Sequence, residues 1–277
     1  MPELPEVEIE RQRLALVMVR HRFDSVVVRR PDLRIPFPEN FGGRLIGQTV
    51  LSLDRRAKYL VAPLASRETL LMHLGMSGSF RVNLEGVEEA QPAEAGGTHD
   101  HVLFHMSSGA VVTFNDPRRF GLIDLVAPEM LATHPVLSTL GPEPLSAEFD
   151  AFTLARACRG KKTPLKVALL DQRVVAGLGN IYASEALHVA RLSPRRQAST
   201  IATASGMPRP SAYQLAAAIK QVLTEAINRL SAADYRSSKF RVYDRENERC
   251  RRRGCGGRIK RRTQAGRSTF FCSVCQR

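Results

Sequence analysis

Residues 127–148 read APEMLATHPVLSTLGPEPLSAE, and this stretch divides the chain into two halves of different character. It contains four prolines, and Gly141 lies among them. Because proline and glycine interrupt regular structure, such a cluster is typical of a connection between domains. We therefore predict an interdomain linker at residues 131–148.

The residues before the linker, 1–130, are predicted to form a β-sandwich domain with an N-terminal helix. After Pro5, apolar residues recur with helical spacing. Short β-rich runs separated by turn residues follow, a texture typical of a sandwich or a barrel. These runs are 25–28, 59–62, 69–74, 79–84, 102–106, 111–114 and 122–126. The acidic, Ala- and Gly-rich segment 85–97 is predicted to be a solvated loop.

The residues after the linker are predicted to form a helical domain at 149–240, followed by a small module at 241–277. The hydrophobic period becomes helical in this half. The helical runs are 149–158, 165–170, 181–190 and 213–230. A β-rich half followed by a helical half predicts an α+β multidomain protein.

The charge balance favours a partner that is rich in phosphate. The chain has 277 residues, with 41 Lys and Arg against 27 Asp and Glu, a formal net charge of +14. A solvated basic surface also explains such an excess, but Lys and Arg release counterions from nucleic acid, so we favour nucleic acid over membrane. No apolar run approaches the roughly 20 residues that span a bilayer. The acidic opening MPELPEVEIE is unlike a signal peptide, so we expect a cytoplasmic protein, associated with the nucleoid if its source is a bacterium.

Four of the five cysteines lie in the last 28 residues. They are Cys250, Cys255, Cys272 and Cys275. Clustered cysteines without a secretory signal more often bind metal than form disulfides, and the spacing C-x4-C, sixteen residues, C-x2-C suits a four-thiolate zinc site. We predict one structural Zn²⁺, because thiolates fill all four positions. A hairpin with strands at 259–262 and 268–271 would carry Arg267 at its tip, and the metal would supply its folding energy.

The N-terminus offers a nucleophile. Pro2 is a small residue that permits removal of Met1, which would expose a secondary amine beside Glu3. An α-amino group has a pKa of about 7.7–8.0, so a useful fraction is unprotonated at neutral pH. Attack on a sugar C1′ would give an iminium, and a neighbouring carboxylate would move protons. The residues alone leave a second interpretation open, in which Pro-x-x-Pro begins a helix and Glu3 and Glu6 favour its dipole.

Seven motifs are spread along the chain. They are MPELPEVE at the N-terminus, RRAKYL around Lys58, HLGMSG at 73–78, HDH at 99–101, NDPRRFG at 115–121, LLDQRVVAGLGNIYASEAL at 169–187 and GRSTFFCSVCQ near the C-terminus. Together, and in this order, they resemble the formamidopyrimidine-DNA glycosylase family, also called 8-oxoguanine DNA glycosylase. The resemblance implies a monomeric, bifunctional glycosylase and lyase that removes oxidised purines. Its partner would be double-stranded DNA containing oxidised bases or abasic sites, cleaved by β,δ-elimination.

The resemblance implies catalytic roles for individual residues. Pro2 would be the Schiff-base nucleophile, Glu3 the general acid and base, and Glu6 part of the substrate pocket. Lys58 would act in β-elimination while gripping a phosphate. Arg267 would promote δ-elimination.

The resemblance also implies two groups of DNA contacts. Met76, Arg118 and Phe120 match the trio that fills the gap left by the extruded nucleotide, where their contacts offset an unstacking cost of roughly a few kcal/mol. On the residues alone, Met76 and Phe120 would be assigned to the core. GLGNIYASEAL resembles the second helix of a helix–two-turn–helix motif, whose amide end suits a phosphate. The candidate contacts to the DNA backbone are His73, His99, Lys162, Lys166, Asn180 and Arg267.

Two features depart from the family pattern. The first zinc pair of the family usually reads C-x2-C, whereas CRRRGC has four intervening residues, which puts the geometry of the zinc knuckle in doubt. The stretch between Leu230 and Val242 is shorter than the Gly-rich loop that closes over the flipped base in relatives. Its shortness puts the lesion preference in doubt.

Two other functions stay open at this point. One is a pyrimidine-preferring glycosylase of the endonuclease VIII type, but those proteins usually begin Pro-Glu-Gly-Pro, and Leu4 stands at the third of these positions here. The other is a non-catalytic zinc protein that only binds damaged DNA. The presence of Pro2, Glu3, Lys58 and Arg267 together argues against it.

Overall fold

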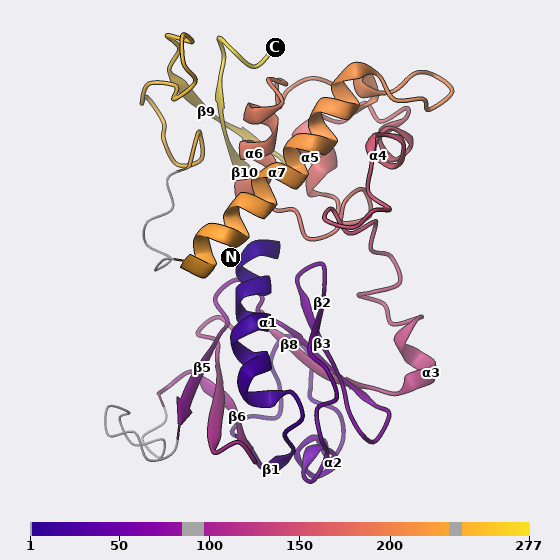
Figure 1. Cartoon of the computed structure of the whole chain (residues 1–277), viewed down its shortest axis with the longest axis vertical. Helices are drawn as coiled ribbons and strands as arrows, with labels where there is room; N and C mark the ends of the chain where they lie inside the picture. Colours follow the sequence, from indigo (N-terminus) through magenta and orange to yellow (C-terminus); the bar gives the residue numbers. More distant parts are fainter. Residues whose placement is uncertain (1, 85–96, 233–239) are drawn as a thin grey trace. The chain divides into compact units, whose positions relative to one another are not determined.

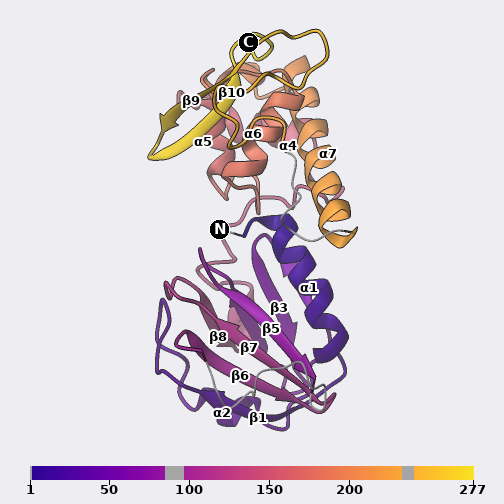
Figure 2. The ribbon, with the colours of Figure 1, turned by 90° about the vertical axis from the view of Figure 1, so that its left-hand side faces the viewer.

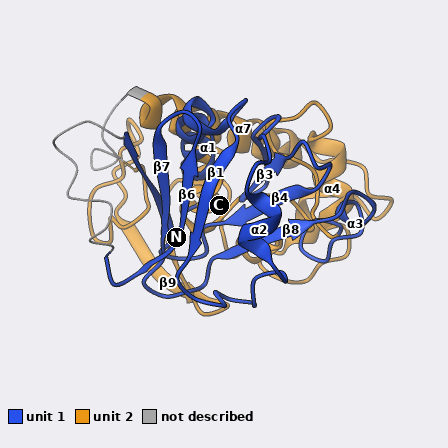
Figure 3. Cartoon of the chain, turned by 90° about the horizontal axis from the view of Figure 1, so that it is seen from below, with its two compact units in different colours: residues 1–2, 6–138 blue, residues 3–5, 139–277 orange. Residues whose placement is uncertain are grey.

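The computed structural model describes residues 2–84, 97–232 and 240–277, which divide into two compact units (Figures 1 and 3). Unit 1 comprises Pro2 and residues 6–138, and unit 2 comprises Glu3–Pro5 and residues 139–277, apart from the gaps just given. Most of the predicted acidic loop, and residues 233–239 of the short segment after Leu230, lie outside the described residues. No helix in the described ranges is long and apolar enough to cross a membrane.

Unit 1 contains two four-stranded sheets with the strand orders β1-β6-β7-β5 and β2-β3-β4-β8 (Figure 2). All neighbouring strands are antiparallel. The strands are β1 (Phe23–Val28), β2 (Asp54–Arg56), β3 (Tyr59–Pro63), β4 (Thr69–His73), β5 (Ser79–Leu84), β6 (Asp100–Met106), β7 (Ala110–Asn115) and β8 (Leu122–Val126). Seven of them coincide with predicted runs, and the three-residue β2 was not predicted.

The two sheets share one apolar core, which makes unit 1 the predicted sandwich. Phe104 and Phe114 from one sheet and Leu60 and Met72 from the other belong to the same cluster of fully buried side chains. Each such side chain contributes about 1.5–3 kcal/mol by leaving water. Helix α1 (Leu4–Met18) adds its apolar face to this cluster. The shared core fixes where the strands end, and therefore where the loops between them begin.

Two short helices of unit 1 were not predicted. They are α2 (Phe41–Leu45) and α3 (Pro128–Leu131). Helix α3 begins at Pro128, the first proline of residues 127–148. Proline is tolerated at the first helical position because the backbone N–H that it lacks would have no partner within the helix. The proline-rich stretch therefore contains a short helix in addition to the segment that connects the two units.

Unit 2 is built from helices around a second core. They are α4 (Ala151–Cys158), α5 (Leu165–Leu170), α6 (Asn180–Val189), the 3-10 turn η1 (Ala198–Ile201) and α7 (Pro210–Ala232). Helix α4 begins at a capping box, in which Asp150 accepts the Thr153 N–H at 2.8 Å and Thr153 accepts the Asp150 N–H at 3.0 Å. The four helical runs predicted from the sequence correspond to α4, α5, α6 and α7.

The C-terminal hairpin consists of β9 (Ile259–Gln264) and β10 (Arg267–Cys272). Its turn is the pair Ala265 and Gly266, with φ of +46° and +73°. Positive φ at both central residues is the geometry of a tight two-residue hairpin turn. The strands are longer than predicted, and Arg267 pairs with Gln264 at the first position of β10.

Candidate active site and DNA-binding residues

The carboxylate of Glu3 caps the N-terminus of α6 by accepting hydrogen bonds from its first backbone N–H groups. Glu3 is 1% exposed, and it accepts the Ile181 N–H at 2.8 Å and the Tyr182 N–H at 3.3 Å. Amides at a helix N-terminus carry partial positive charge and stabilise an anion there. The sequence predicted a phosphate at this end of the helix. In the structure the anion at these amides is a carboxylate of the protein itself.

Two glycines of the GLGN motif make this placement possible. A Cβ on Gly179 would lie 2.2 Å from Glu3 Cδ, and a Cβ on Gly177 would lie 2.7 Å from Leu4 Cδ1. Gly177 also has a φ of +79°, and its carbonyl accepts the Leu4 N–H at 3.2 Å. The turn is thus a cradle for residues 3 and 4. Because Pro2 is bonded to Glu3, the cradle also limits where the N-terminal amine lies.

Lys166 joins three segments of unit 2 beside this cradle. Its Nζ donates to Asn180 Oδ1 at 2.6 Å, to Ser268 O at 2.9 Å and to Thr269 Oγ1 at 2.9 Å. Burial lowers the pKa of Lys166 to about 8, with the negative charge of Glu3 opposing the shift. An ammonium has three donors, and all three meet protein acceptors here. Lys166 therefore ties β10 to α6, and its role as a contact to the DNA backbone stays a prediction.

Asn180 shares this network. Its Nδ2 donates to Ser268 O at 3.0 Å, while its Oδ1 accepts from Lys166. Both polar atoms of the side chain thus have protein partners, and the predicted contact of Asn180 with the DNA backbone stays a prediction. The structure brings Glu3, Lys166 and Asn180 together at one end of α6, next to the strand that begins at Arg267.

Lys58 and His73 are neighbours in unit 1. Lys58 follows Ala57, which has a φ of +55°, in the turn between β2 and β3. The ring of His73 lies 4.6 Å from that of Tyr59, and its Nδ1 accepts the Gly75 N–H at 2.9 Å. Burial and the positive charge of Lys58 lower the pKa of His73 to about 4. The ring is therefore neutral at neutral pH and presents Nε2–H as its donor.

Met76 and Phe120 are 43% and 44% exposed. The residues alone would assign both to the core, and that interpretation is wrong. The guanidinium carbon of Arg118 lies 4.9 Å from the centroid of the Phe120 ring, a cation–π distance. An apolar side chain, an aromatic ring and a cation are thus displayed at the surface of unit 1.

Asp116 holds these two loops, although the sequence did not single it out as a functional residue. It is fully buried, and it accepts the Ser77 hydroxyl at 2.5 Å, the Gly121 N–H at 2.7 Å and the Arg118 N–H at 3.3 Å. Its carboxylate therefore connects the loop of Met76 to the loop of Arg118. The only signal in the sequence is an aspartate before proline after a strand, which is typical of a turn.

Replacement of Asp116 by asparagine is expected to lower the free energy of unfolding by about 1–3 kcal/mol, because an amide NH₂ would face donors at one of the two oxygen positions. Binding to DNA that contains an abasic-site analogue should weaken with it. Asp24→Asn is the matched control, since Asp24 pairs with Arg22 at the surface and should cost less than about 1 kcal/mol. Urea denaturation with the same midpoint for both variants would show that Asp116 has no such role.

The remaining predicted residues are half-buried or exposed. Pro2 and Glu6 are half-buried at the start of α1. His99, Lys162 and Arg267 are exposed. Of the predicted phosphate contacts, these three present charged or polar side chains to solvent.

The four clustered cysteines converge. Their Sγ atoms all lie within 4.8 Å of one another, with Cys255 and Cys272 at 3.5 Å and Cys250 and Cys275 at 3.9 Å. Four thiolates around a tetrahedral ion with bonds of about 2.3 Å lie roughly 3.8 Å apart. The cluster therefore fits a metal ion, and the wider C-x4-C spacing does not prevent convergence. His188, which the sequence analysis missed, places Nε2 3.3 Å from Cys250 Sγ and can support that ligand from outside.

Comparison with known proteins places these features in context. Residues 1–123 match the family model described as the formamidopyrimidine-DNA glycosylase N-terminal domain, and residues 140–236 match the one described as its H2TH domain. Proteins named formamidopyrimidine-DNA glycosylase from Beijerinckia indica and Bradyrhizobium diazoefficiens are 53% and 55% identical over the full length of both chains. Those alignments run over 288 and 294 positions, so the relatives hold residues that this 277-residue chain lacks.

Solved structures agree over the full length of both chains. The Lactococcus lactis formamidopyrimidine-DNA glycosylase, bound non-covalently to DNA containing an AP site, has a TM-score of 0.86 at 30% identity. A protein named MutM, in complex with DNA containing carbocyclic 8-oxo-G, has a TM-score of 0.86 at 29% identity.

Proposed function

The chain belongs to the formamidopyrimidine-DNA glycosylase family, and from this premise we propose how its own residues excise oxidised purines and cleave the abasic site that results. It is a base-excision-repair glycosylase with AP lyase activity that acts on DNA. Neither the endonuclease VIII type nor a non-catalytic zinc protein is favoured. The observation that carries the proposed mechanism is the buried carboxylate of Glu3, held by the α6 amides directly after Pro2.

The proposed reaction begins with the secondary amine of Pro2 after Met1 has been removed. The amine attacks C1′ of the damaged nucleoside, the bond from C1′ to the base breaks, and the base leaves with the electron pair. The amine then loses its proton, and the C1′–O4′ bond of the sugar breaks as O4′ takes up a proton, which leaves an iminium at C1′. The iminium acidifies C2′, so loss of a C2′ proton expels the 3′ phosphate. Glu3 moves protons to and from the sugar ring. Its fixed position at the helix end supports this role, because a proton shuttle must stay within reach of the sugar.

Two basic residues complete the proposed eliminations. Lys58 grips a phosphate and assists β-elimination, and Arg267 promotes δ-elimination from the hairpin. Lys166 supports Arg267 indirectly, because its Nζ donates a hydrogen bond to the carbonyl of the adjacent Ser268. We therefore infer that Lys166 and Asn180 position the hairpin.

The proposed DNA contacts fall into two groups. Met76, Arg118 and Phe120 fill the gap left by the extruded nucleotide, and their exposure supports this. The backbone phosphates would be held by His73 through Nε2–H and by two exposed residues, His99 and Lys162. Glu6 would line the pocket for the damaged base. All of these residues belong to one chain, so the protein would act as a monomer. The location that this function implies is the cytoplasm, and the nucleoid in a bacterium.

The four-cysteine site would hold one Zn²⁺ through Cys250, Cys255, Cys272 and Cys275. The ion would supply folding energy to the hairpin that carries Arg267 and takes no part in the eliminations. The convergence of the four sulfurs supports this assignment.

The test of the proposed function is reductive trapping on a duplex that contains one abasic site. Borohydride would reduce the iminium to a stable amine and leave protein and DNA covalently joined. Mass spectrometry of the digested adduct is expected to place the DNA on Pro2. An adduct on a lysine, or no adduct from a protein that cleaves the strand, would refute the assignment of the nucleophile.

The short segment between Leu230 and Val242 leads to a prediction about lesion preference. Residues 233–239 of this segment lie outside the described part of the chain. Fewer backbone amides around the extruded base would let water compete for its hydrogen bonds. Excision of 8-oxoguanine is expected to fall behind excision of formamidopyrimidines by about tenfold, or ~1.4 kcal/mol, while cleavage of preformed abasic sites stays fast.

Single-turnover rates on the three substrates measure this preference. Abasic-site cleavage is the internal control, because the sugar chemistry depends on residues elsewhere in the chain. The competing interpretation is that residues 236–239 form a tighter turn that does the same job. Equal excision of the two lesions would favour that turn and contradict the prediction.

A further inference from the structure

A pocket of about 270 Å³ lies beside the first cysteine pair of unit 2. Its lining residues are His188, Val189, Gln221, Arg241, Arg251 and Arg252. They come from the end of α6, the middle of α7, the segment that follows residue 239, and the CRRRGC knuckle. Among the described residues that line it there are three arginines and no carboxylate. The pocket is therefore a concave, cationic site.

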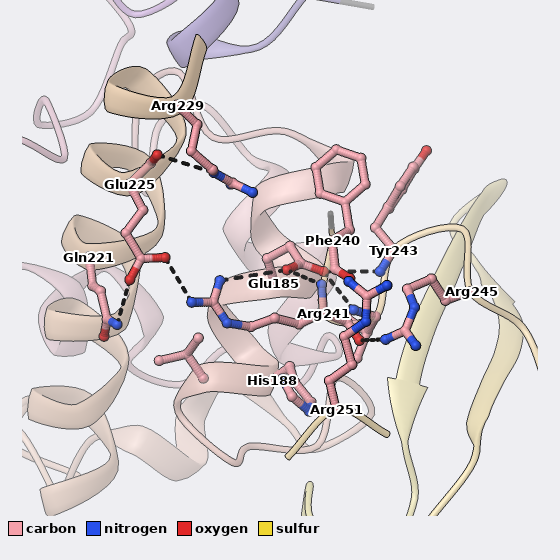
Figure 4. Close-up of polar contacts among 12 residues, drawn as sticks. Glu185, His188, Gln221, Glu225, Arg229, Phe240, Arg241, Tyr243, Arg245 and Arg251 are labelled. Carbon is pink, nitrogen blue, oxygen red and sulfur yellow. Dashed lines mark hydrogen bonds and ion pairs between the residues drawn. The ribbon is translucent and has the colours of Figure 1, made fainter. Parts of the chain in front are cut away.

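Arg241 lies between two carboxylates, those of Glu225 and Glu185 (Figure 4). Its guanidinium donates to Glu225 Oε2 at 2.7 Å, and its backbone N–H donates to Glu185 Oε2 at 2.8 Å. Glu185 is buried and also accepts the N–H groups of Val242 and Tyr243. The guanidinium also lies 3.9 Å from Glu185 Oε2, so two carboxylates fix the side chain and compensate its charge. The positive charge left for an anion therefore comes from the other two arginines.

The other two arginines come from the knuckle. Arg252 donates to the carbonyls of His188 at 2.5 Å and Val189 at 3.3 Å, at the end of α6. Its Nε is buried and has no partner in the described part of the chain. Arg251 is exposed and donates to Phe240 O at 2.8 Å. Neither arginine forms an ion pair with a described carboxylate, so both guanidinium groups keep charge and donors available to an anion.

The pocket lies apart from the catalytic end of α6. His188 follows Asn180 by eight residues, which is about 12 Å along a helix that rises 1.5 Å per residue. The knuckle has four residues between its cysteines where the family usually has two, and three of the four are arginines. The departure from the family pattern thus coincides with the cationic wall of the pocket.

We propose that this pocket is a second phosphate-binding site, which takes either a backbone phosphate of bound DNA away from the lesion or a free phosphate anion. Guanidinium groups present pairs of N–H donors that match the oxygens of a phosphate. The volume lies below the roughly 300–1,000 Å³ of sites for drug-sized ligands. A pocket of this size suits a small anionic group such as a phosphate.

The test compares Arg251→Gln with Arg253→Gln in the zinc-loaded, full-length protein. Both remove one exposed positive charge from the knuckle, but Arg253 does not line the pocket. Calorimetric titration with inorganic phosphate measures the free anion. The salt dependence of binding to a duplex with an abasic-site analogue measures the DNA phosphate. Zinc content and thermal unfolding confirm that both variants are folded.

Each outcome decides the proposal. If the site takes a DNA phosphate, Arg251→Gln lowers the slope of log K against log salt by about 1, and Arg253→Gln lowers it less. If the site takes a free anion, Arg251→Gln weakens phosphate binding by about tenfold or more and Arg253→Gln does not, a difference of ~1.4 kcal/mol. If the two variants behave alike in both measurements, the pocket adds nothing to the general positive charge and the proposal is overturned.

Discussion

Retention of Met1, or replacement of Pro2 by glycine, is expected to reduce strand cleavage at abasic sites by roughly a hundredfold or more. Retention of Met1 buries the amine of Pro2 in a peptide bond, so no iminium forms on it. Glycine keeps an amine, but a primary one, whose iminium can lose its remaining N–H proton and become a neutral imine that withdraws electrons less strongly. A hundredfold loss corresponds to about 2.7 kcal/mol of transition-state stabilisation.

The measurement combines intact mass, trapping and cleavage on one preparation. Intact mass establishes whether Met1 is present. Pro5→Ala is the matched control, because Pro5 is the second proline of the same motif. Its nitrogen is part of a peptide bond and cannot act as an amine nucleophile. Normal cleavage and normal trapping by a protein that retains Met1 would contradict the role of Pro2.

Replacement of Cys272 by alanine is expected to abolish zinc binding and with it the ordered hairpin. Cys272 is fully buried within the four-sulfur cluster, and structural zinc sites contribute about 10–16 kcal/mol of apparent binding free energy in isolated peptides. Loss of one ligand should release the metal, so DNA affinity and the final elimination should both fall by more than tenfold. The wild-type protein should contain one zinc per chain by elemental analysis.

Two controls separate metal loss from other effects. Cys158→Ala removes a buried cysteine of the helical core outside the cluster, so it should keep the zinc. Arg267→Ala should also keep the zinc, while it weakens DNA binding and slows the last elimination. Wild-type protein without zinc, and fully active under chelation, would contradict the assignment.

The sequence predicted the architecture well where local patterns determine it. Seven of the strands and the four longer helices of unit 2 coincide with periodic runs, because each buries one face against a core. The three-residue β2 is too short to show a period. Helix α3 was hidden because its initial proline has the same appearance as a linker proline.

The site was harder to predict because its contacts join distant parts of the chain. Glu3 meets Ile181 across 178 positions, and Lys166 meets Ser268 across 102. No local pattern contains such pairings, so the resemblance suggested roles for these residues without showing which atoms they contact. Asp116 was missed for the same reason, since its hydrogen bonds to Ser77 become visible only when two loops lie together.

The cradle that receives Glu3 also sets an order of events during synthesis of the protein. The carboxylate leaves the ribosome among the first residues, but its partners at Ile181 and Tyr182 are added 178 and 179 positions later. At about 5–20 residues per second, this delay is roughly 10–40 s. Throughout that interval residues 3 and 4 lack their partners in unit 2, which leaves the N-terminus open to the removal of Met1 that the proposed function requires. If Pro2 is the nucleophile, we expect its amine to be exposed before the hydrogen bonds of Glu3 to α6 form.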